Sequence, residues 1–131
     1  MRKNEASILI IDDDPDVRKS IALLLAANGF SDVETASRAM EGVKKASAKK
    51  YDLILLDMIM PQVSGWGVLE KISAKKIKTR VLVLSAVGLP EVVREEVGKR
   101  YPGVGFLPKT SAAAELADTI REALKAPAKK I

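Results

Sequence analysis

The stretch Ile8-Leu9-Ile10-Ile11-Asp12-Asp13 decides the fold of this chain. Four consecutive large aliphatic residues are typical of a strand that is buried on both faces, as in parallel sheets covered by helices. Two carboxylates follow directly, at the carboxyl end of the predicted strand. The stretch Leu53-Ile54-Leu55-Leu56-Asp57 repeats the pattern, with an apolar run closed by an aspartate. The two stretches together predict a covered parallel sheet with acidic residues along one edge.

Short apolar runs alternate with helical patterns along the whole chain. We expect strands at residues 7–11, 33–36, 51–56, 81–84 and 104–107. The segments between them have apolar residues at helical spacing, with boundary signals at Pro15, Asn28-Gly29, Ser37, Pro61, Gly65, Pro90, Ser111 and Pro127. We interpret Ser37 and Ser111 as helix caps. Strict alternation predicts an α/β fold, a doubly wound (βα)5 flavodoxin-like parallel sheet with strand order 2-1-3-4-5 and right-handed crossovers.

Length and composition set the class of protein. The 131 residues, 47% of them hydrophobic, suit one domain with one core. We place this domain at residues 1–125 and interpret residues 126–131 as a tail or a linker stub. The absence of cysteine and histidine excludes disulfides, zinc sites and a histidine-based triad. No apolar run approaches the roughly 18 residues of a membrane span, and no signal peptide is evident, so we expect a cytoplasmic protein without membrane contact.

The net charge of +5 raises the question of nucleic-acid binding. The lysines, however, gather where two predicted helices end, at Lys44, Lys45, Lys49 and Lys50 and at Lys71, Lys75, Lys76 and Lys78. Cations at helix carboxyl ends are favoured by the helix dipole. No aromatic residues interleave with these lysines for stacking on bases. We therefore predict a solvated basic pole opposite the acidic edge, without direct nucleic-acid binding.

Five residues at predicted strand ends form the candidate site: Asp12, Asp13, Asp57, Ser85 and Lys109. In the predicted order the first and third strands are neighbours, which brings the three carboxylates together. A hard cation relieves their repulsion, and Mg²⁺ fits best because it takes few carboxylates and keeps waters that phosphate oxygens can replace. Lys109 would neutralise a phosphate oxygen, and Ser85 would offer a hydroxyl. Asp57 is then the natural nucleophile for phosphoryl transfer.

These motifs resemble those of the response-regulator receiver domains of two-component signalling, over about residues 6–125. The resemblance is carried by the Asp12-Asp13 pair, Asp57-Met58-Ile59-Met60-Pro61 with Gly65 following, Leu84-Ser85-Ala86, and Phe106-Leu107-Pro108-Lys109. Each motif alone is weak evidence for this family. All four in this order on a (βα)5 pattern are highly specific.

The resemblance implies a role for each site residue. Asp57 would be the phosphoacceptor, and Mg²⁺ would be bound by Asp13, Asp57 and the Ile59 carbonyl, with Asp12 acting largely through water. Lys109 would contact the phosphoryl group. Ser85 would swing toward the phosphate and Phe106 would follow. This movement would change the face of the fourth helix, fifth strand and fifth helix.

The resemblance also implies partners. The phosphoryl donor would be a histidine kinase, a phosphotransfer protein, or a small molecule such as acetyl phosphate. The altered face would be read by a downstream protein or output domain, or by a second receiver in a phosphorylation-dependent homodimer. The chain would catalyse only its own phosphorylation and dephosphorylation and would not be an enzyme acting on another substrate.

The chain departs from the family pattern at several positions. Thr110 follows Lys109, where the family usually has proline and a cis bond. A non-proline cis bond costs about 2.5–4 kcal/mol, so we expect a trans bond and a shifted loop. Tyr101-Pro102-Gly103 resembles an inserted turn. Ile59 and Val87 cannot orient an attacking water by a hydrogen bond, which predicts slow self-dephosphorylation.

Two other functions compete with the phosphorylated switch. A phosphohydrolase of the haloacid-dehalogenase type needs Asp-x-Asp-x-Thr/Val, but Asp16 stands where Thr or Val belongs. A degenerate receiver, a binding module indifferent to phosphate, is supported by Thr110. Single residues have plainer interpretations as well: Asp14 as a helix cap, Trp66 as packing, and Phe106 as part of the core.

Overall fold

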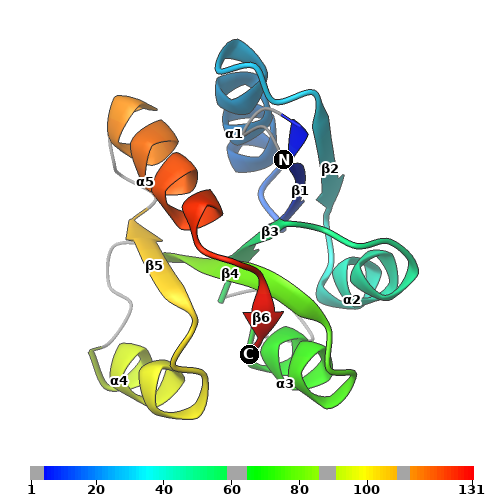
Figure 1. The fold of residues 1–131 in the computed structure, drawn as a ribbon, viewed down its shortest axis with the longest axis vertical. Helices are drawn as coiled ribbons and strands as arrows, with labels where there is room; N and C mark the ends of the chain where they lie inside the picture. Colours follow the sequence, from blue (N-terminus) through cyan, green and yellow to red (C-terminus); the bar gives the residue numbers. More distant parts are fainter. Residues whose placement is uncertain (1–4, 59–64, 86–90, 109–112) are drawn as a thin grey trace.

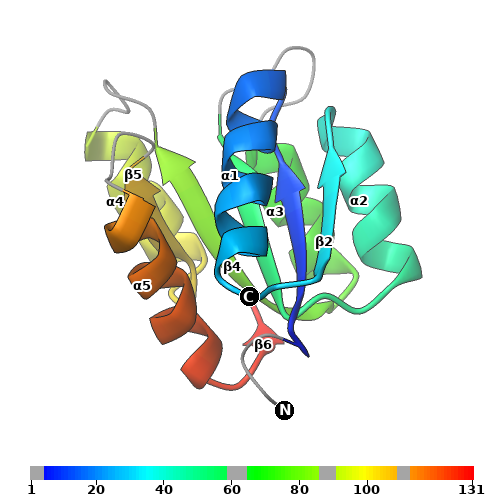
Figure 2. The same cartoon turned by 90° about the horizontal axis from the view of Figure 1, so that it is seen from above.

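Five parallel strands form the main sheet in the order β2-β1-β3-β4-β5 (Figure 1). The computed structural model describes residues 5–58, 65–85, 91–108 and 113–131. The strands are β1 (Ser7–Ile11), β2 (Asp32–Ala36), β3 (Leu53–Asp57), β4 (Lys78–Ser85) and β5 (Gly105–Pro108). The predicted α/β fold and strand order are confirmed. The strands end along one edge of the sheet (Figure 2).

Helices cover both faces of this sheet. They are α1 (Pro15–Ala27), α2 (Ala39–Ala48), α3 (Gly65–Ala74), α4 (Glu91–Arg100) and α5 (Ala113–Lys125). α1 and α5 lie on one face, and α2, α3 and α4 lie on the other (Figure 1). None of the helices in the described parts of the chain combines the length and the apolar character needed to cross a membrane.

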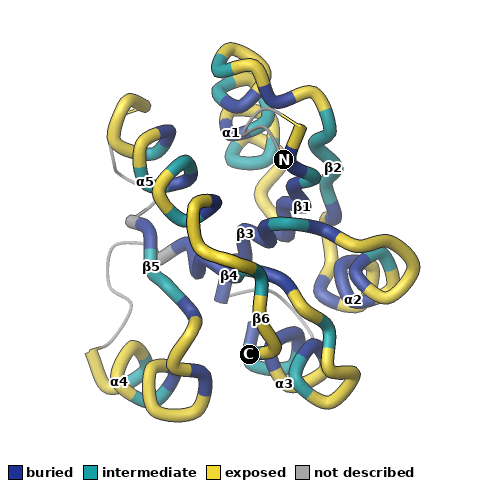
Figure 3. Tube along the Cα trace, in the orientation of Figure 1, coloured by how far each residue is buried: buried dark blue, intermediate teal, exposed yellow. Residues whose placement is uncertain are grey.

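β1 and β3 form the centre of the core because both of their faces are covered. Ile8 and Ile10 belong to the cluster under α1 and α5, whereas Leu9 and Ile11 belong to the cluster under α2 and α3. This alternation follows from the two-residue period of a strand. Both strands are largely buried (Figure 3), and burial of each such side chain contributes about 1.5–3 kcal/mol to stability.

The ends of α1 match the sequence signals. Asp14 is the N-cap and its carboxylate accepts a hydrogen bond of 2.9 Å from the Asp16 N–H, while Pro15 occupies the first turn. Gly29 follows the helix with a φ of 88°, a left-handed conformation that favours glycine. The cap interpretation of Asp14 is therefore confirmed.

The cap predicted for α2 is wrong by one residue. Arg38 is the N-cap and makes no side-chain cap. Ser37 lies just outside the helix, where its N–H donates to the Glu41 carboxylate at 2.7 Å. The Ser37 hydroxyl donates to the same carboxylate at 3.4 Å, so it is directed at Glu41 and does not cap the first turn. The predicted cap at Ser111 lies outside the described residues.

Several of the predicted strand boundaries shift by one residue, and the starts of β3 and β4 shift by two and three residues. β3 begins at Leu53, two residues after the predicted start, and the Asp52 carboxylate just before it accepts the Ser7 N–H at 2.9 Å. β4 begins at Lys78, three residues before the predicted start, because its first residues have another partner. That partner is β6 (Lys129–Lys130), which pairs antiparallel with Lys78 and Thr79.

The last residues of the chain therefore contact the domain. The Ala126 carbonyl accepts from Arg80, the Ile131 carbonyl accepts from Ser73 at 3.3 Å, and Ile131 packs against the core cluster under α2 and α3. Periodicity gave no signal for a two-residue strand. The division of the chain at residue 125 stays a prediction.

One group of charges at the opposite edge makes the stability depend on pH. Hydrogen bonds from Ser7 and then Lys49 lower the pKa of Asp32, and Lys49 likewise lowers the pKa of Glu34. A carboxylate with a lowered folded-state pKa stabilises the fold above its unfolded pKa and loses that contribution as the pH falls. The lysine lies 2.9 Å from Asp32 and 2.8 Å from Glu34, and all three side chains are about two-fifths exposed.

We therefore expect the free energy of unfolding to fall as the pH drops from about 5 to about 3. The variant Asp32→Asn/Glu34→Gln should show a shallower fall, by less than about 1 kcal/mol because solvent screens the group. Urea denaturation at a series of pH values measures this difference. A double variant with the same pH slope as the parent chain would contradict the assignment.

Candidate metal centre

The site is built by the register of β1 against β3. Ile11 pairs with Leu56, so the next residue of each strand, Asp12 and Asp57, reaches the same edge of the sheet. Both carboxylates are buried, at 0% and 4% exposure. Asp13 follows Asp12 and is exposed. Two adjacent apolar strands of matched register are thus sufficient to bring the acids together.

The three carboxylates form one potential ligand set. One oxygen from each of Asp12, Asp13 and Asp57 lies within 4.8 Å of the others. The predicted clustering of these residues is therefore seen in the structure. Their burial differs, because Asp13 opens to solvent and the other two do not, so a ligand can approach from the side of Asp13.

The donor set fits Mg²⁺. Hard oxygen ligands from a small number of carboxylates, with room for water on one side, are what this ion prefers. Zinc would prefer nitrogen or sulfur ligands, which the chain lacks because it has no cysteine or histidine. If the ion binds, Asp12, Asp13 and Asp57 would hold it.

The loop after β1 is fixed by its own hydrogen bonds. Asp12 accepts the Asp14 N–H at 2.9 Å through its carboxylate, and its carbonyl accepts from the Arg18 guanidinium at 2.7 Å. The Asp12 N–H donates to the Ala36 carbonyl of β2 at 3.1 Å. Both the backbone and the side chain of Asp12 are thereby oriented before any ligand arrives.

Gly65 fixes the other side of the site. Its N–H donates to the Met58 carbonyl at 3.0 Å. A Cβ atom at this position would lie 2.6 Å from the Met58 Cα and 2.9 Å from the Asp57 carbonyl oxygen. The start of α3 therefore packs against the backbone of Asp57 as closely as glycine allows.

The sequence alone did not predict how Gly65 and Arg18 support the site. Gly65 was part of a motif, but its contact with Asp57 follows from the placement of α3. Arg18 was not singled out. It lies in the first turns of α1, four residues after the cap, and this helical spacing was the signal that could have found it.

The remaining predicted residues lie on β4 and β5 or outside the described part of the chain. Ser85 is the last residue of β4 and pairs with Pro108, so its backbone reaches the acidic edge. Phe106 pairs with Val83 and is half-buried, with the Arg94 guanidinium 5.1 Å from its ring centroid. Lys109, Ile59, Thr110 and Val87 lie outside the described residues, so their predicted roles stay predictions.

Trp66 lies at the start of α3, one residue after Gly65. It packs partly against the core, as its interpretation as a packing residue requires. The Arg100 guanidinium lies 5.4 Å from its ring centroid. An indole so near the acidic edge is a suitable fluorescence reporter of ligand binding there.

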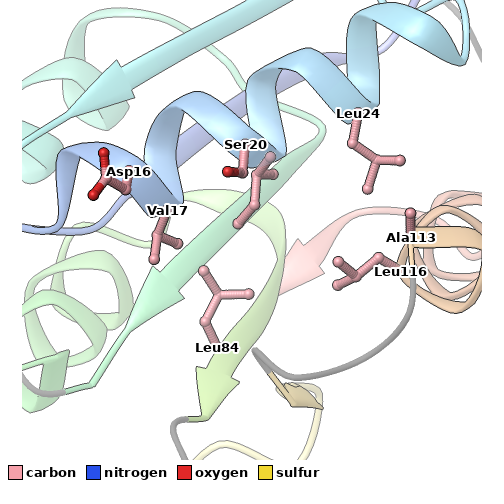
Figure 4. Close-up of a pocket in the computed structure, with 8 residues that line it drawn as sticks. Asp16, Val17, Ser20, Leu24, Leu84, Ala113 and Leu116 are labelled. Carbon is pink, nitrogen blue, oxygen red and sulfur yellow. The ribbon is translucent and has the colours of Figure 1, made fainter.

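An apolar hollow lies beside the acidic edge, between α1, α5 and the end of β4. It encloses about 360 Å³ and is lined mostly by aliphatic side chains, with Asp16 and Ser20 among them. Figure 4 shows Val17 of α1 and Leu84 of β4 facing each other across it, with Leu116 of α5 at one side. Asp16 and Val17 follow the acidic loop directly, so the hollow adjoins the carboxylate cluster.

Comparison with known proteins gives one family. Residues 8–121 match the model of the response regulator receiver domain. A cell cycle response regulator, CtrA of Brucella ovis, is 38% identical over 100 residues, which are 76% of this chain and 39% of that protein. The chain therefore spans about two-fifths of the length of this curated relative.

Solved structures agree with this match. The chemotaxis protein CheY4 of Vibrio cholerae has a TM-score of 0.74 and 26% identity, covering 91% of this chain and 98% of its own. The receiver domain of the Francisella response regulator 1452 has a TM-score of 0.79 and 26% identity, covering 92% and 98%. Both share the fold described above.

Proposed function

The chain belongs to the response-regulator receiver domain family of two-component signalling, and from this premise we propose that it is a Mg²⁺-dependent phosphoacceptor whose acceptor is Asp57. The observation that carries the proposal is the set of three carboxylate oxygens within 4.8 Å at one edge of the sheet. The family is one of signalling proteins and not of classical enzymes. A cytoplasmic location stays a prediction.

The proposed reaction is a single phosphoryl transfer. An oxygen of the Asp57 carboxylate attacks the phosphorus of the donor and forms an O–P bond. The bond from phosphorus to the imidazole nitrogen of a phosphohistidine, or to the acetate oxygen of acetyl phosphate, breaks, and the leaving group keeps the electron pair. A bound Mg²⁺ supplies neutralisation of the charge on the phosphoryl oxygens.

The residues around Asp57 position the acceptor. Burial and the contact with Gly65 hold its backbone, while Asp12 and Asp13 supply the remaining carboxylates of the ion site. Such positioning is a main source of rate enhancement in phosphoryl transfer. From the sequence, we assign contact with the phosphoryl group to Lys109 and a hydroxyl hydrogen bond to Ser85.

A protein donor has a natural docking place in the apolar hollow between α1 and α5. The hollow adjoins the acidic loop and presents mainly aliphatic side chains such as Val17 and Leu116. A histidine kinase or phosphotransfer protein seated there would bring its phosphohistidine to the acidic edge.

The output surface is proposed to be the face of α4, β5 and α5. Among the described residues of α4, Val97 is the one that is buried, so little apolar contact must be remade when the helix moves. Movement of Ser85 and Phe106 after phosphorylation would alter this face. A downstream protein, an output domain or a second receiver would then read the change.

The direct test uses acetyl phosphate and intact mass spectrometry. With Mg²⁺ present, the chain should gain one phosphoryl group, and excess EDTA should abolish the gain. The haloacid-dehalogenase alternative predicts turnover of an added phosphate ester, which we do not expect. If beryllofluoride and Mg²⁺ leave Trp66 fluorescence unchanged and no phosphoryl group is gained, the degenerate receiver is the better description.

The two exposed acids of the first loop should differ in their effect on Mg²⁺ binding. Asp13→Asn removes one ligand and should weaken Mg²⁺ binding about tenfold or more. Asp14→Asn removes the same charge at the next residue of the chain, but asparagine is an equally good helix cap. We expect its effect to be less than about threefold, from charge alone.

Titration of Mg²⁺ followed by Trp66 fluorescence, at constant ionic strength, measures both affinities. Thermal melts in EDTA confirm that both variants are folded. If both substitutions weaken Mg²⁺ binding equally, the ion is attracted by the net negative charge of the loop and Asp13 is not a ligand.

The phosphorylated form should be long-lived. Ile59 and Val87 offer no hydrogen bond to orient an attacking water. We predict that Ile59→Asn shortens the lifetime of the acyl phosphate, whereas Ile59→Val leaves it unchanged. The decay of the phosphorylated mass after removal of acetyl phosphate measures this, and a parent lifetime of a few seconds would contradict the prediction.

A further inference from the structure

α2 and α3 lie side by side on the same face of the sheet (Figure 1). A shallow groove lies between them. This α2–α3 groove has a volume of about 510 Å³ and is lined by Met40, Val43, Lys44, Ser47, Ala48, Lys71 and Lys75. The outer surfaces of both helices are largely exposed (Figure 3). It is separate from the carboxylate cluster, which none of these residues enters.

Three lysines converge on the groove. Lys44 comes from α2, Lys71 comes from the last turn of α3, and Lys75 directly follows the end of α3. All three are exposed, and within the described part of the chain no carboxylate lies within ion-pair distance of them. The helix dipole favours cations near a carboxyl end but does not select a face of the helix. It therefore does not explain why these lysines share one groove.

Neighbouring lysines show the contrast. The Lys45 ammonium donates to the Thr35 carbonyl at 2.6 Å, and Lys49 pairs with Asp32 and Glu34. Those two side chains bind α2 to β2 and have a structural role. The lysines of the groove make no such contacts among the described residues.

An exposed apolar side chain lies among these cations. Met40 is 52% exposed, while Val43, one turn further along α2, is buried at 5%. Methionine is flexible and polarisable, and it adapts to different apolar partners. The groove thus combines an apolar contact point with a ring of positive charge.

The groove continues beyond the end of α2. A second hollow shares Ser47 and Ala48 with it and adds Ala46, the ion-paired Lys49, Lys50, Ile77 and Lys78. From Met40 to Ala48 the helix rises about 12 Å, so the continuous surface is long enough for two turns or more of a helix. Its far end repeats the combination of an aliphatic side chain with lysines.

We propose that the α2–α3 groove binds an acidic amphipathic helix of a partner protein. Apolar side chains of the partner would contact Met40, and carboxylates one turn apart would pair with Lys44, Lys71 and Lys75. The recognition depends on complementary charge around an apolar centre, which is how helix-in-groove complexes obtain both orientation and affinity.

A nucleic acid fits this surface less well. No aromatic side chain lines either hollow for stacking on bases, and no arginine is present for bidentate contact with phosphate. The exposed methionine would gain nothing from a phosphate backbone. The proposal does not rest on phosphorylation of Asp57, since no residue of the groove belongs to that site.

The probe is a fluorescein-labelled synthetic helix with leucine on one face and glutamate on the flanking positions. Fluorescence anisotropy with the full chain measures its dissociation constant. A second peptide with serine in place of leucine has the same charge but no apolar face, and we expect it to bind at least about fivefold more weakly. A single-stranded oligonucleotide of equal charge should bind more weakly than the first peptide.

Two matched charge variants locate the binding. Lys71→Gln/Lys75→Gln should weaken the binding of the leucine peptide about tenfold. Lys19→Gln/Lys99→Gln removes the same charge from exposed positions on α1 and α4 and should weaken it less than about threefold. Met40→Ser keeps the charge and should weaken it about fivefold.

Phosphorylation by acetyl phosphate should be unchanged in all three variants, which shows that each is folded. Equal effects of the two lysine pairs would overturn the proposal, because binding would then follow net charge. Equal binding of the leucine and serine peptides, or tighter binding of the oligonucleotide, would overturn it as well, because the groove would not recognise an amphipathic helix.

Discussion

Asp57→Asn abolishes the Mg²⁺-dependent gain of a phosphoryl group from acetyl phosphate. The asparagine amide has the shape of the carboxylate but is too weak a nucleophile to form the acyl phosphate. The other carboxylates cannot replace it, because their positions are set by the loop after β1, where Asp12 is held by its hydrogen bond from the Asp14 N–H. We therefore expect a loss of the modification and not a shift to another residue.

Asp52→Asn is the matched control. Asp52 directly precedes β3, at the opposite end from Asp57, and accepts a hydrogen bond from the Ser7 N–H that an asparagine oxygen can also accept. This variant should be phosphorylated like the parent chain. Intact mass followed by peptide mapping compares the two. A full phosphoryl gain in Asp57→Asn would assign the acceptor elsewhere and end the proposed mechanism.

Gly65→Ala destabilises the chain and disturbs the acceptor, whereas Gly98→Ala does not. At Gly65 a Cβ atom would lie 2.6 Å from the Met58 Cα and 2.9 Å from the Asp57 carbonyl, which is backbone that cannot move freely. Overpacking of this kind costs about 1–3 kcal/mol. At Gly98 no atom lies within 4 Å of the added methyl group. Alanine there should raise the free energy of unfolding by about 0.5–1 kcal/mol, since glycine is unfavourable within a helix.

The two glycine variants should thus change stability in opposite directions, and urea denaturation measures both. The phosphorylation rate separates the local effect from the global one. In Gly65→Ala the Asp57 backbone should be displaced. We expect this variant to be phosphorylated on the order of tenfold more slowly than the parent chain, or slower still, even when it is fully folded. A Gly65→Ala chain that is stable and phosphorylated at the parent rate would show that this close contact does not hold the acceptor.

The strands of the fold could be predicted because their apolar runs permit few other structures. Ile8 to Ile11 and Leu53 to Leu56 are apolar on both faces, so burial between two helix layers is the arrangement that removes them from water. The clustering of Asp12, Asp13 and Asp57 then followed from strand order, because each acid directly follows or ends a central strand. For these strands and acids, the local sequence pattern and the overall fold favour the same placement of each residue.

Features that depend on distant partners were predicted less well. Ser37 had the right residue type for a cap, yet its own N–H and hydroxyl both bond to the Glu41 carboxylate, and α2 begins after Arg38. β6 has two lysines and no apolar pattern, and it exists because the edge of β4 at Lys78 and Thr79 accepts another strand. Neither outcome is encoded in the spacing of nearby residues.

The sequence by itself determined the parallel sheet, its order and the three acids at its edge, because burial of continuous apolar strands dominates the free energy. Tertiary structure alone decided how those acids are held: the fit of Gly65 against Asp57 and the bond from Arg18 to the Asp12 carbonyl. It also decided that Lys44, Lys71 and Lys75 share one groove with Met40. These features join residues of different elements, and helix packing, which local periodicity does not specify, sets their distances.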